Sequence, residues 1–140
     1  MRILPLALGT LLAVAATCGK AGAIDSPRDL VEACQSLEKG TTGKGTHVKI
    51  PSTPQALQCW GYMQALQDLS VLADESGTRL LGSCPPADTT SLQLIRSFLA
   101  YARAHPGALT GNTAVVVIDA LREAFPCRRA SRAPGRSAQK

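Results

Sequence analysis

Aromatic residues are scarce in this chain, and this scarcity limits what the chain can bind by stacking. Trp, Tyr and Phe together make up 4% of the 140 residues, with a single Trp. Interleaved basic and aromatic residues, typical of proteins that bind single-stranded nucleic acid, are absent. The net charge of +5 does not indicate nucleic acid either, because residues 24–127 hold 8 of the 15 Lys and Arg but all 10 Asp and Glu. We therefore expect no nucleic-acid partner.

The residue patterns of common catalytic sites are also missing. The only histidines are His47 and His105, and no His-Glu-x-x-His, G-x-S-x-G or phosphate-binding glycine pattern occurs. Neighbouring carboxylates such as Asp74 and Glu75 are typical of a solvated surface. An enzyme needs a nucleophile, a base or a metal in a workable arrangement. We therefore expect no enzymatic activity, no catalytic residue, no metal and no cofactor.

Residues 1–23 have the features of an export signal. Arg2 gives a positive start, the run over residues 3–17 is almost entirely apolar, and Ala-Gly-Ala ending at Ala23 is a small-x-small cleavage site. The apolar run is shorter than the roughly 20 residues that span a bilayer. We expect cleavage near Ala23 and a periplasmic protein. The alternatives are an uncleaved anchor helix and a lipoprotein attached through Cys18.

Four cysteines remain after this cleavage: Cys34, Cys59, Cys84 and Cys127. An even number in a small exported domain predicts two disulfides. A zinc site is disfavoured, because no C-x-x-C occurs and no two of these cysteines are closer than 25 positions. Three pairings are possible. The simplest is sequential, with Cys34 bonded to Cys59 and Cys84 bonded to Cys127.

Four segments of residues 24–127 have helix signals. Ser26-Pro27 and Thr53-Pro54 each place an N-cap residue before a proline in the first turn. The first helix should stop at Gly40, the second near Asp74, the third should run from Thr89 or Thr90 to before Pro106, and the last from 111–113 to Pro126. These segments predict an all-α fold, a small four-helix bundle-like domain stapled by two disulfides. The basic tail, 128–140, has the composition of a disordered segment.

Apolar residues at helical spacing define the expected inward faces of these segments. Gly61 lies inside the second helix, where glycine is unfavourable, so we expect another backbone to pass close to it. His105 lies at a helix end, where it can contact the last carbonyls. Asp119, Arg122 and Glu123 should point away from the core. The inward-facing positions are expected to be Leu30, Val31, Cys34, Leu37, Ala56, Cys59, Trp60, Met63, Leu66, Leu69/Ser70, Leu92, Ile95, Phe98, Leu99, Ala102, Ala114, Val117, Ile118, Leu121 and Phe125.

Two loops are candidates for partner binding. Residues 38–52 are glycine-rich and basic, and His47–Ile50 could form a short strand, although no partner strand is evident. This loop is either a solvated connector or a recognition loop. Residues 76–90 form the second candidate, which Cys84 can brace and which would therefore lose less entropy on binding. The candidate partner-binding residues are Lys44, His47, Lys49 and Arg79.

Over residues 28–127 the chain resembles the Rap/Tai family of periplasmic immunity proteins, which is associated with type VI secretion. The order of the four cysteines and the final block carry most of the likeness. The matching pieces are Leu30-x-x-x-Cys34, Cys59-x-Gly61-Tyr62 with Asp68 six residues later, Cys84-x-Pro86, Tyr101-x-x-x-His105-Pro106 and Ala120-Leu121-x-x-Ala124-Phe125-Pro126-Cys127.

This resemblance implies a helical, disulfide-bonded protein that binds a peptidoglycan amidase effector in the periplasm and covers its active-site cleft. The amidases concerned are papain-like Cys/His hydrolases, and the family also implies a homodimer. The long loop between Cys34 and Cys59 and the Arg-rich tail depart from the family pattern. An alternative function is an envelope-associated structural protein of the same fold without a toxin. In that case the tail would touch anionic lipid or cell-wall polymers, and any membrane contact would be only transient or through this basic tail.

Overall fold

The structure is a computed structural model and describes residues 24–44 and 47–127. The expected export signal and basic tail lie outside these residues. The elements follow in the order α1 Pro27–Gly40, β1 Thr42–Lys44, β2 His47–Lys49, α2 Pro54–Ser70, α3 Ser91–Ala104, the short 3-10 helix η1 Pro106–Thr110, and α4 Thr113–Ala124. No helix in the described part of the chain has both the length and the apolar character needed to cross a bilayer.

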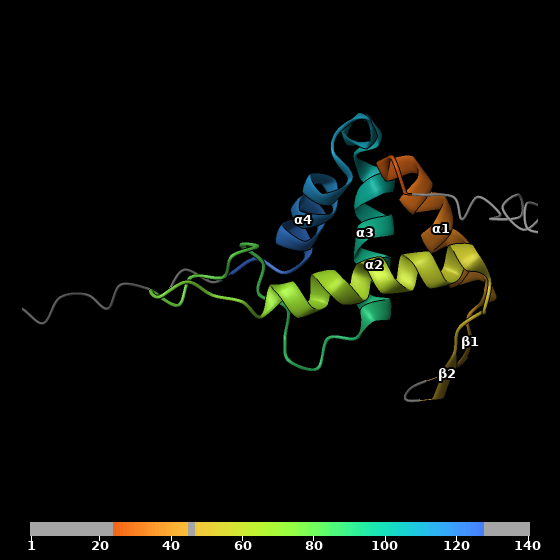
Figure 1. Cartoon of the computed structure of the whole chain (residues 1–140), viewed down its shortest axis with the longest axis horizontal. Coiled ribbons are helices and arrows are strands. Elements are labelled where there is room, and N and C mark those ends of the chain that lie inside the picture. Colours follow the sequence, from red (N-terminus) through yellow and green to blue (C-terminus); the bar gives the residue numbers. More distant parts are fainter. Residues whose placement is uncertain (1–23, 45–46, 128–140) are drawn as a thin grey trace, which may run out of the picture.

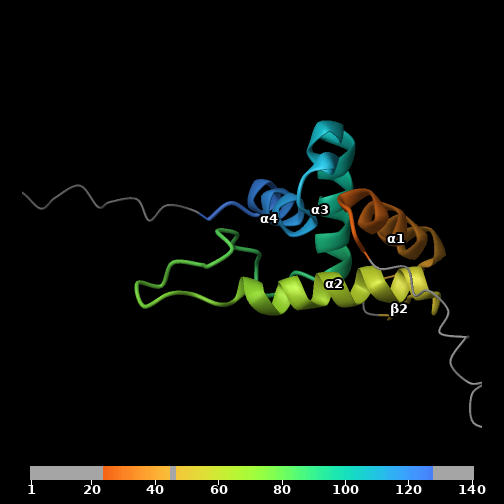
Figure 2. The ribbon, with the colours of Figure 1, turned by 45° about the horizontal axis from the view of Figure 1, so that its top comes forward.

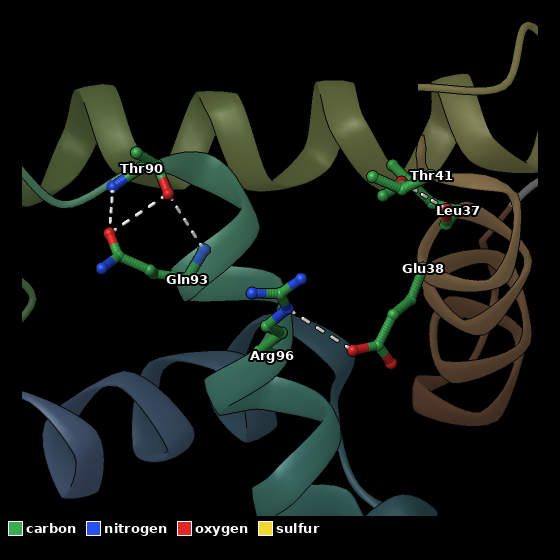
Figure 3. Close-up of polar contacts among 6 residues, drawn as sticks. All are labelled: Leu37, Glu38, Thr41, Thr90, Gln93 and Arg96. Atoms are coloured by element: carbon green, nitrogen blue, oxygen red, sulfur yellow. Dashed lines mark hydrogen bonds and ion pairs between the residues drawn. The ribbon is translucent and has the colours of Figure 1, made fainter. Parts of the chain in front are cut away.

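Each of the four α-helices starts at a side chain that caps it. Ser26, Thr53, Thr90 and Asn112 are the N-caps of α1, α2, α3 and α4, and each accepts a hydrogen bond from a backbone N–H of the first turn. Figure 3 shows the reciprocal pair at α3, in which the Gln93 N–H donates to Thr90 Oγ1 and the Thr90 N–H donates to Gln93 Oε1. The sequence-based helix starts are therefore confirmed.

The α1 capping box also affects an acidic group. Asp29 accepts hydrogen bonds from the hydroxyl and the backbone N–H of Ser26, each at 2.8 Å. These hydrogen bonds stabilise the carboxylate and so lower the pKa of Asp29, and the bond from the Ser26 hydroxyl has the largest effect. A negative charge in the first turn is favourable against the helix dipole.

Helix α3 lies at the centre of the fold, between α1 and α4, while α2 crosses it steeply (Figures 1 and 2). Phe98 of α3 is the largest fully buried side chain. An ion pair on the outside, Arg96 Nε to Glu38 Oε1 at 3.6 Å, links α3 to α1 (Figure 3). Around Phe98 the core is formed by Leu30, Ala33, Cys34, Leu37, Ala56, Cys59, Met63, Leu66, Leu94, Ile95, Leu99, Val116, Val117, Ala120 and Leu121.

Both disulfides have the sequential pairing that the sequence predicted. Cys34–Cys59 joins α1 to α2 with a Cα–Cα distance of 5.0 Å, and both cysteines are completely buried. Cys84–Cys127 joins the segment before α3 to the third residue after α4, with a Cα–Cα distance of 4.8 Å. Cys84 is exposed. One bridge therefore belongs to the core and the other to the surface.

The all-α expectation is correct for the helices but incomplete, because residues 42–49 form a small antiparallel hairpin. Strand β2 was expected without a partner, and its partner is Thr42–Lys44, with Gly43 opposite Val48. Gly43 has φ +98°, and a Cβ there would lie 2.0 Å from the His47 carbonyl oxygen. A glycine is therefore required for this close turn.

Two expectations about α2 are wrong. The helix ends at Ser70 rather than near Asp74. Gly61 was expected to let another backbone pass close by, but it is exposed and a Cβ at this position would meet nothing within 4 Å. Nothing within the described fold therefore explains the glycine.

The C-terminal half shows two further differences from the sequence-based expectations. Val116 and Ala120 are buried in α4 where Ala114 and Ile118 were expected, so the inward face is rotated. His105 lies at the end of α3 as expected. Its side chain, however, stacks on Tyr101 with ring centroids 4.3 Å apart and lies 3.3 Å from the Glu123 carboxylate. The imidazole thus contacts the side chains of Tyr101 in α3 and Glu123 in α4.

Candidate partner-binding surface

Two loops leave opposite ends of α2. The β1–β2 hairpin precedes its first residue, and a projecting loop, residues 71–82, follows its last residue (Figure 1). The 17 residues of α2 separate the two loops by roughly 25 Å. The structure therefore does not bring Arg79 together with Lys44, His47 and Lys49 into one site.

The outer part of the projecting loop is a narrow backbone ladder. Asp74 N donates to the Thr78 carbonyl at 3.0 Å, and Leu80 N donates to the Leu72 carbonyl at 3.0 Å. Ala73 and Arg79 form an isolated antiparallel bridge between the same two sides. All of residues 71–80 are exposed. The segment therefore has a defined backbone although it packs against little else.

The tip of the projecting loop is organised by one carboxylate. Asp74 Oδ1 accepts hydrogen bonds from the backbone N–H of Ser76 at 2.9 Å, from the Ser76 hydroxyl at 2.6 Å and from the Thr78 N–H at 2.9 Å. These hydrogen bonds lower the pKa of Asp74, and the bond from the Ser76 hydroxyl has the largest effect. Gly77, with φ +80°, completes the turn. The tip therefore has a defined conformation and carries a negative charge.

The base of the projecting loop is fixed to the end of α4. Arg122 Nε donates to the Leu81 carbonyl at 2.7 Å, and a Cβ at Gly82 would come within 2.9 Å of that same nitrogen. Cys84 N donates to the Phe125 carbonyl at 2.8 Å, beside the Cys84–Cys127 bridge. Arg122 was expected to point away from the core, and its side chain is indeed exposed. It also donates to a carbonyl that lies 41 residues away in the sequence.

A second set of polar contacts holds the segment after the loop against α2. Gln67 Nε2 donates to the Thr89 carbonyl at 3.0 Å, and the buried Ser91 hydroxyl donates to Gln67 Oε1 at 2.7 Å. A hollow of about 170 Å³ remains between α2 and this segment, lined in part by Val71, Arg79 and Pro86. The Arg79 guanidinium donates to the Val71 carbonyl. Arg79, a predicted contact residue, thus also supports the loop.

Exposed apolar side chains surround the base of the projecting loop. Val71 is 64% exposed and Leu80 58% exposed, and Leu69 and Leu72 are also largely exposed. Exposed apolar groups beside a structured loop make this surface a candidate for partner binding. The sequence did not reveal them, because Leu69 and Leu72 continue the apolar pattern of α2.

The hairpin at the other end of α2 has fewer supports. The described side chains of His47, Val48 and Lys49 are exposed, whereas that of Lys44 lies outside the described set. Among the described residues of this hairpin, the short β1–β2 ladder joins the two strands. His47 and Lys49 are accessible to a partner, and their role as contact residues remains a prediction.

Metal binding and thiol chemistry find no support in the described residues. No group of three or more His, Cys, Asp or Glu side chains lies close enough to hold a metal ion there. All four cysteines of the domain are in disulfides. The projecting loop has a defined backbone and exposed apolar side chains, and both features suit recognition of another protein.

A comparison with protein families gives a match to the described domain. The family model of Rap1a immunity proteins matches residues 26–127, which is nearly the whole described domain. The chain belongs to this family. Neither the curated proteins nor the solved structures gave a significant match. Membership indicates an immunity protein for a secreted effector, and such a protein binds its effector as a partner. The family is generally non-enzymatic.

Proposed function

We propose that this protein is a periplasmic immunity protein that neutralises a peptidoglycan amidase effector of type VI secretion by covering its active-site cleft. Three observations support the proposal: membership of the Rap1a immunity proteins, an N-terminal segment with the features of an export signal, and a projecting loop that is held by hydrogen bonds and carries exposed apolar side chains. We further propose that the protein acts as a homodimer.

The proposed mode of inhibition rests on how the projecting loop is held in place. Its tip is held by Asp74 and its base by Arg122 and the Cys84–Cys127 bridge. A loop that is ordered before binding loses little conformational entropy when it enters a cleft. Val71 and Leu80 supply apolar area that binding would bury. The loop therefore fits a plug that blocks substrate access.

The charge of the tip also suits a papain-like Cys/His site. Asp74 is ionised well below neutral pH because hydrogen bonds lower its pKa, and Glu75 adds a second carboxylate beside it. Such a site contains an imidazole that carries a positive charge when paired with a thiolate. A carboxylate near this imidazolium is electrostatically complementary and favours the correct docking.

The test is a titration of the purified amidase with the mature protein while cell-wall hydrolysis is followed. A stoichiometric inhibitor should abolish hydrolysis at equivalence, with a linear fall before it. If substoichiometric amounts silence the amidase, the protein acts by another mechanism. If no complex forms with correctly disulfide-bonded protein, the alternative of an envelope-associated protein without a toxin is favoured.

Two matched variants locate the contact surface. Val71→Asp/Leu80→Asp changes side chains that are exposed and leaves the loop's hydrogen bonds intact, so the fold should persist. We expect its affinity for the amidase to fall roughly 30-fold or more if these side chains are central to the interface. The comparison variant, Lys44→Ala/His47→Ala/Lys49→Ala, removes the predicted contact residues of the hairpin. If the projecting loop is the plug, this variant should keep its affinity within about threefold of wild type. The reverse result would make the hairpin the plug.

A further inference from the structure

The hollow between α2 and residues 85–89 is large enough to hold one side chain of a partner. Its volume is about 170 Å³, and its lining includes Leu94, which is completely buried, and Ser70, which is 2% exposed. The hollow therefore reaches the core of the protein. An engineered apolar cavity of about 150 Å³ binds a benzene molecule, so the volume suits a group of that size.

The walls of the hollow are fixed by hydrogen bonds within the protein. Gln67 Nε2 donates to the Thr89 carbonyl at 3.0 Å, and the Ser70 hydroxyl donates to the Gln67 carbonyl at 2.7 Å. The Thr89 N–H donates to the Pro86 carbonyl at 3.0 Å and closes a turn. These polar groups already have partners, so they offer little to a strongly polar ligand. The apolar atoms of Val71, Pro86 and Leu94 favour an apolar one.

Arg79 adds hydrogen-bond donors to the edge of the hollow. Its side chain lines the hollow, and one guanidinium nitrogen donates to the Val71 carbonyl. A guanidinium has five N–H donors. Among the described residues, no carboxylate forms an ion pair with Arg79. The remaining donors can therefore bind an acceptor that enters with the ligand, such as a backbone carbonyl.

The charged groups around the hollow are mostly acidic. Arg79 is the only Lys or Arg among residues 68–95, and the next cation, Arg96, pairs with Glu38 of α1. Helix α4 adds Arg122, which pairs with Asp119 at 3.5 Å, and Glu123, which lies beside His105. The carboxylates of this region are Asp68, Asp74, Glu75, Asp88, Asp119 and Glu123. They outnumber the two guanidiniums of Arg79 and Arg122, so basic residues on a partner are favoured here.

We propose that the hollow is the anchor site for one apolar side chain of the effector, flanked on the effector by Lys or Arg, with Arg79 donating to a carbonyl beside that side chain. This inference rests on the proposed function and names the chemistry that the protein recognises. The exposed Val71 and Leu80 would exclude water around the anchor. The basic tail offers no such anchor, because residues 128–140 contain no apolar side chain larger than proline.

The first test needs no effector and uses isobutanol, whose branched carbon skeleton resembles a leucine side chain. Isobutanol is titrated into the mature protein while amide NMR signals are recorded. The signals of Val71, Thr89 and Leu94 should shift saturably, with a dissociation constant of roughly 1–100 mM, while that of Leu30 in α1 stays unchanged. If these three signals do not shift, or if all signals shift alike, the hollow is not an apolar binding site.

The second test fills the hollow with a side chain of the protein itself. Ala87 lines the hollow and is exposed, so Ala87→Phe should occupy the space without disturbing the core. We expect it to abolish the isobutanol shifts and to lower affinity for the amidase roughly 30-fold or more. Ala104→Phe is the matched control, because Ala104 is exposed at the opposite end of α3. Affinity should stay within about threefold in this control.

The basic flank of the anchor is tested by removing two carboxylates beside the hollow. Asp68→Asn/Asp88→Asn should slow association with the amidase about threefold at low salt. Asp25→Asn/Glu32→Gln is the control, because both residues are exposed near α1, and its association rate should match that of wild type. Equal rates for the two double variants would show that the effector has no basic flank at this site.

The anchor site and the inhibitory function can fail separately. If the wild-type protein inhibits the amidase and Ala87→Phe inhibits it equally well, the proposed function stands and the anchor site is wrong. If the wild-type protein does not bind the amidase, the proposed function is wrong, and the isobutanol titration still shows whether the hollow binds an apolar group. Circular dichroism of Ala87→Phe should match that of Ala104→Phe, which separates loss of binding from loss of fold.

Discussion

The two loops at the ends of α2 differ in what holds them in shape. The hairpin of β1 and β2 is supported by its own ladder and by its short connections to α1 and α2. The projecting loop has a carboxylate-centred tip and is tied to α4 by the Arg122 hydrogen bond and by Cys84–Cys127. One loop depends on local pairing and the other on tertiary anchors.

This difference bears directly on binding. A loop held only by local pairing opens at low free energy, whereas a loop tied to a core helix opens only when the anchor breaks. The projecting loop is therefore the better candidate for a preorganised plug. The disulfides follow the same division, since the buried Cys34–Cys59 bridge encloses the hairpin and the surface Cys84–Cys127 bridge anchors the projecting loop.

The largest effect should come from removing the buried bridge. Cys34→Ala/Cys59→Ala removes a crosslink and leaves unfilled space among fully buried residues, so we expect the free energy of unfolding to fall by about 3–5 kcal/mol. Urea denaturation followed by circular dichroism measures this loss. A loss under 1 kcal/mol would mean that the helices around this bridge pack without its help.

Removing the surface bridge should have a smaller global effect and a stronger local one. Cys84→Ala/Cys127→Ala is expected to lower stability by about 2–4 kcal/mol through the entropy of the unfolded chain. It should also increase amide exchange throughout residues 71–83 while exchange in the hairpin stays unchanged. Equal increases in both loops would contradict the assignment of this bridge to the projecting loop.

Arg122 provides a finer test of the anchor. Arg122→Ala removes the hydrogen bond to the Leu81 carbonyl and should cost about 1 kcal/mol, with faster amide exchange in residues 79–83. Asp119→Ala is the matched control, because it removes only the exposed ion pair that Asp119 makes with Arg122 at 3.5 Å. This control should change stability by no more than about 0.5 kcal/mol.

The smallest effect concerns pH and the tip of the projecting loop. Because the pKa of Asp74 is lowered in the folded protein, its contribution to order is present above the ordinary aspartate pKa of 3.8 and is lost as pH falls through the lower folded value. NMR should show the amide signals of Ser76 and Thr78 shifting toward random-coil positions in that range. Asp74→Ala should show these shifts already at neutral pH. If the Ser76 and Thr78 amide signals of this variant keep their wild-type positions at neutral pH, the carboxylate does not organise the tip.

Sequence reasoning found the parts of the fold that depend on neighbouring residues. Ser26, Thr53 and Asn112 cap helices because their side chains reach N–H groups two or three positions ahead. Sequence reasoning failed where an apolar pattern fits either a buried helix face or an exposed surface. Leu69 and Leu72 extend the helical pattern of α2, yet the helix ends at Ser70, and Leu69 and Leu72 lie on the surface.

The candidate surface was predicted only in part. Residues 76–90 were correctly expected to be braced through Cys84. The contact between Arg122 and Leu81 spans 41 positions, and no local pattern signals it. The partner strand of β2 was missed for a related reason: residues 42–44 are Thr-Gly-Lys and have no alternation of apolar and polar side chains.

The sequence by itself determined the helix starts and the family, because caps and motif order are properties of the linear chain. It favoured the sequential pairing of the disulfides, which the structure then confirmed. The tertiary structure decided which side of α2 and α4 faces the core, what holds the projecting loop and why Gly61 faces open space. These features depend on which surfaces the helices bury against one another, and burial is fixed only when the whole chain packs.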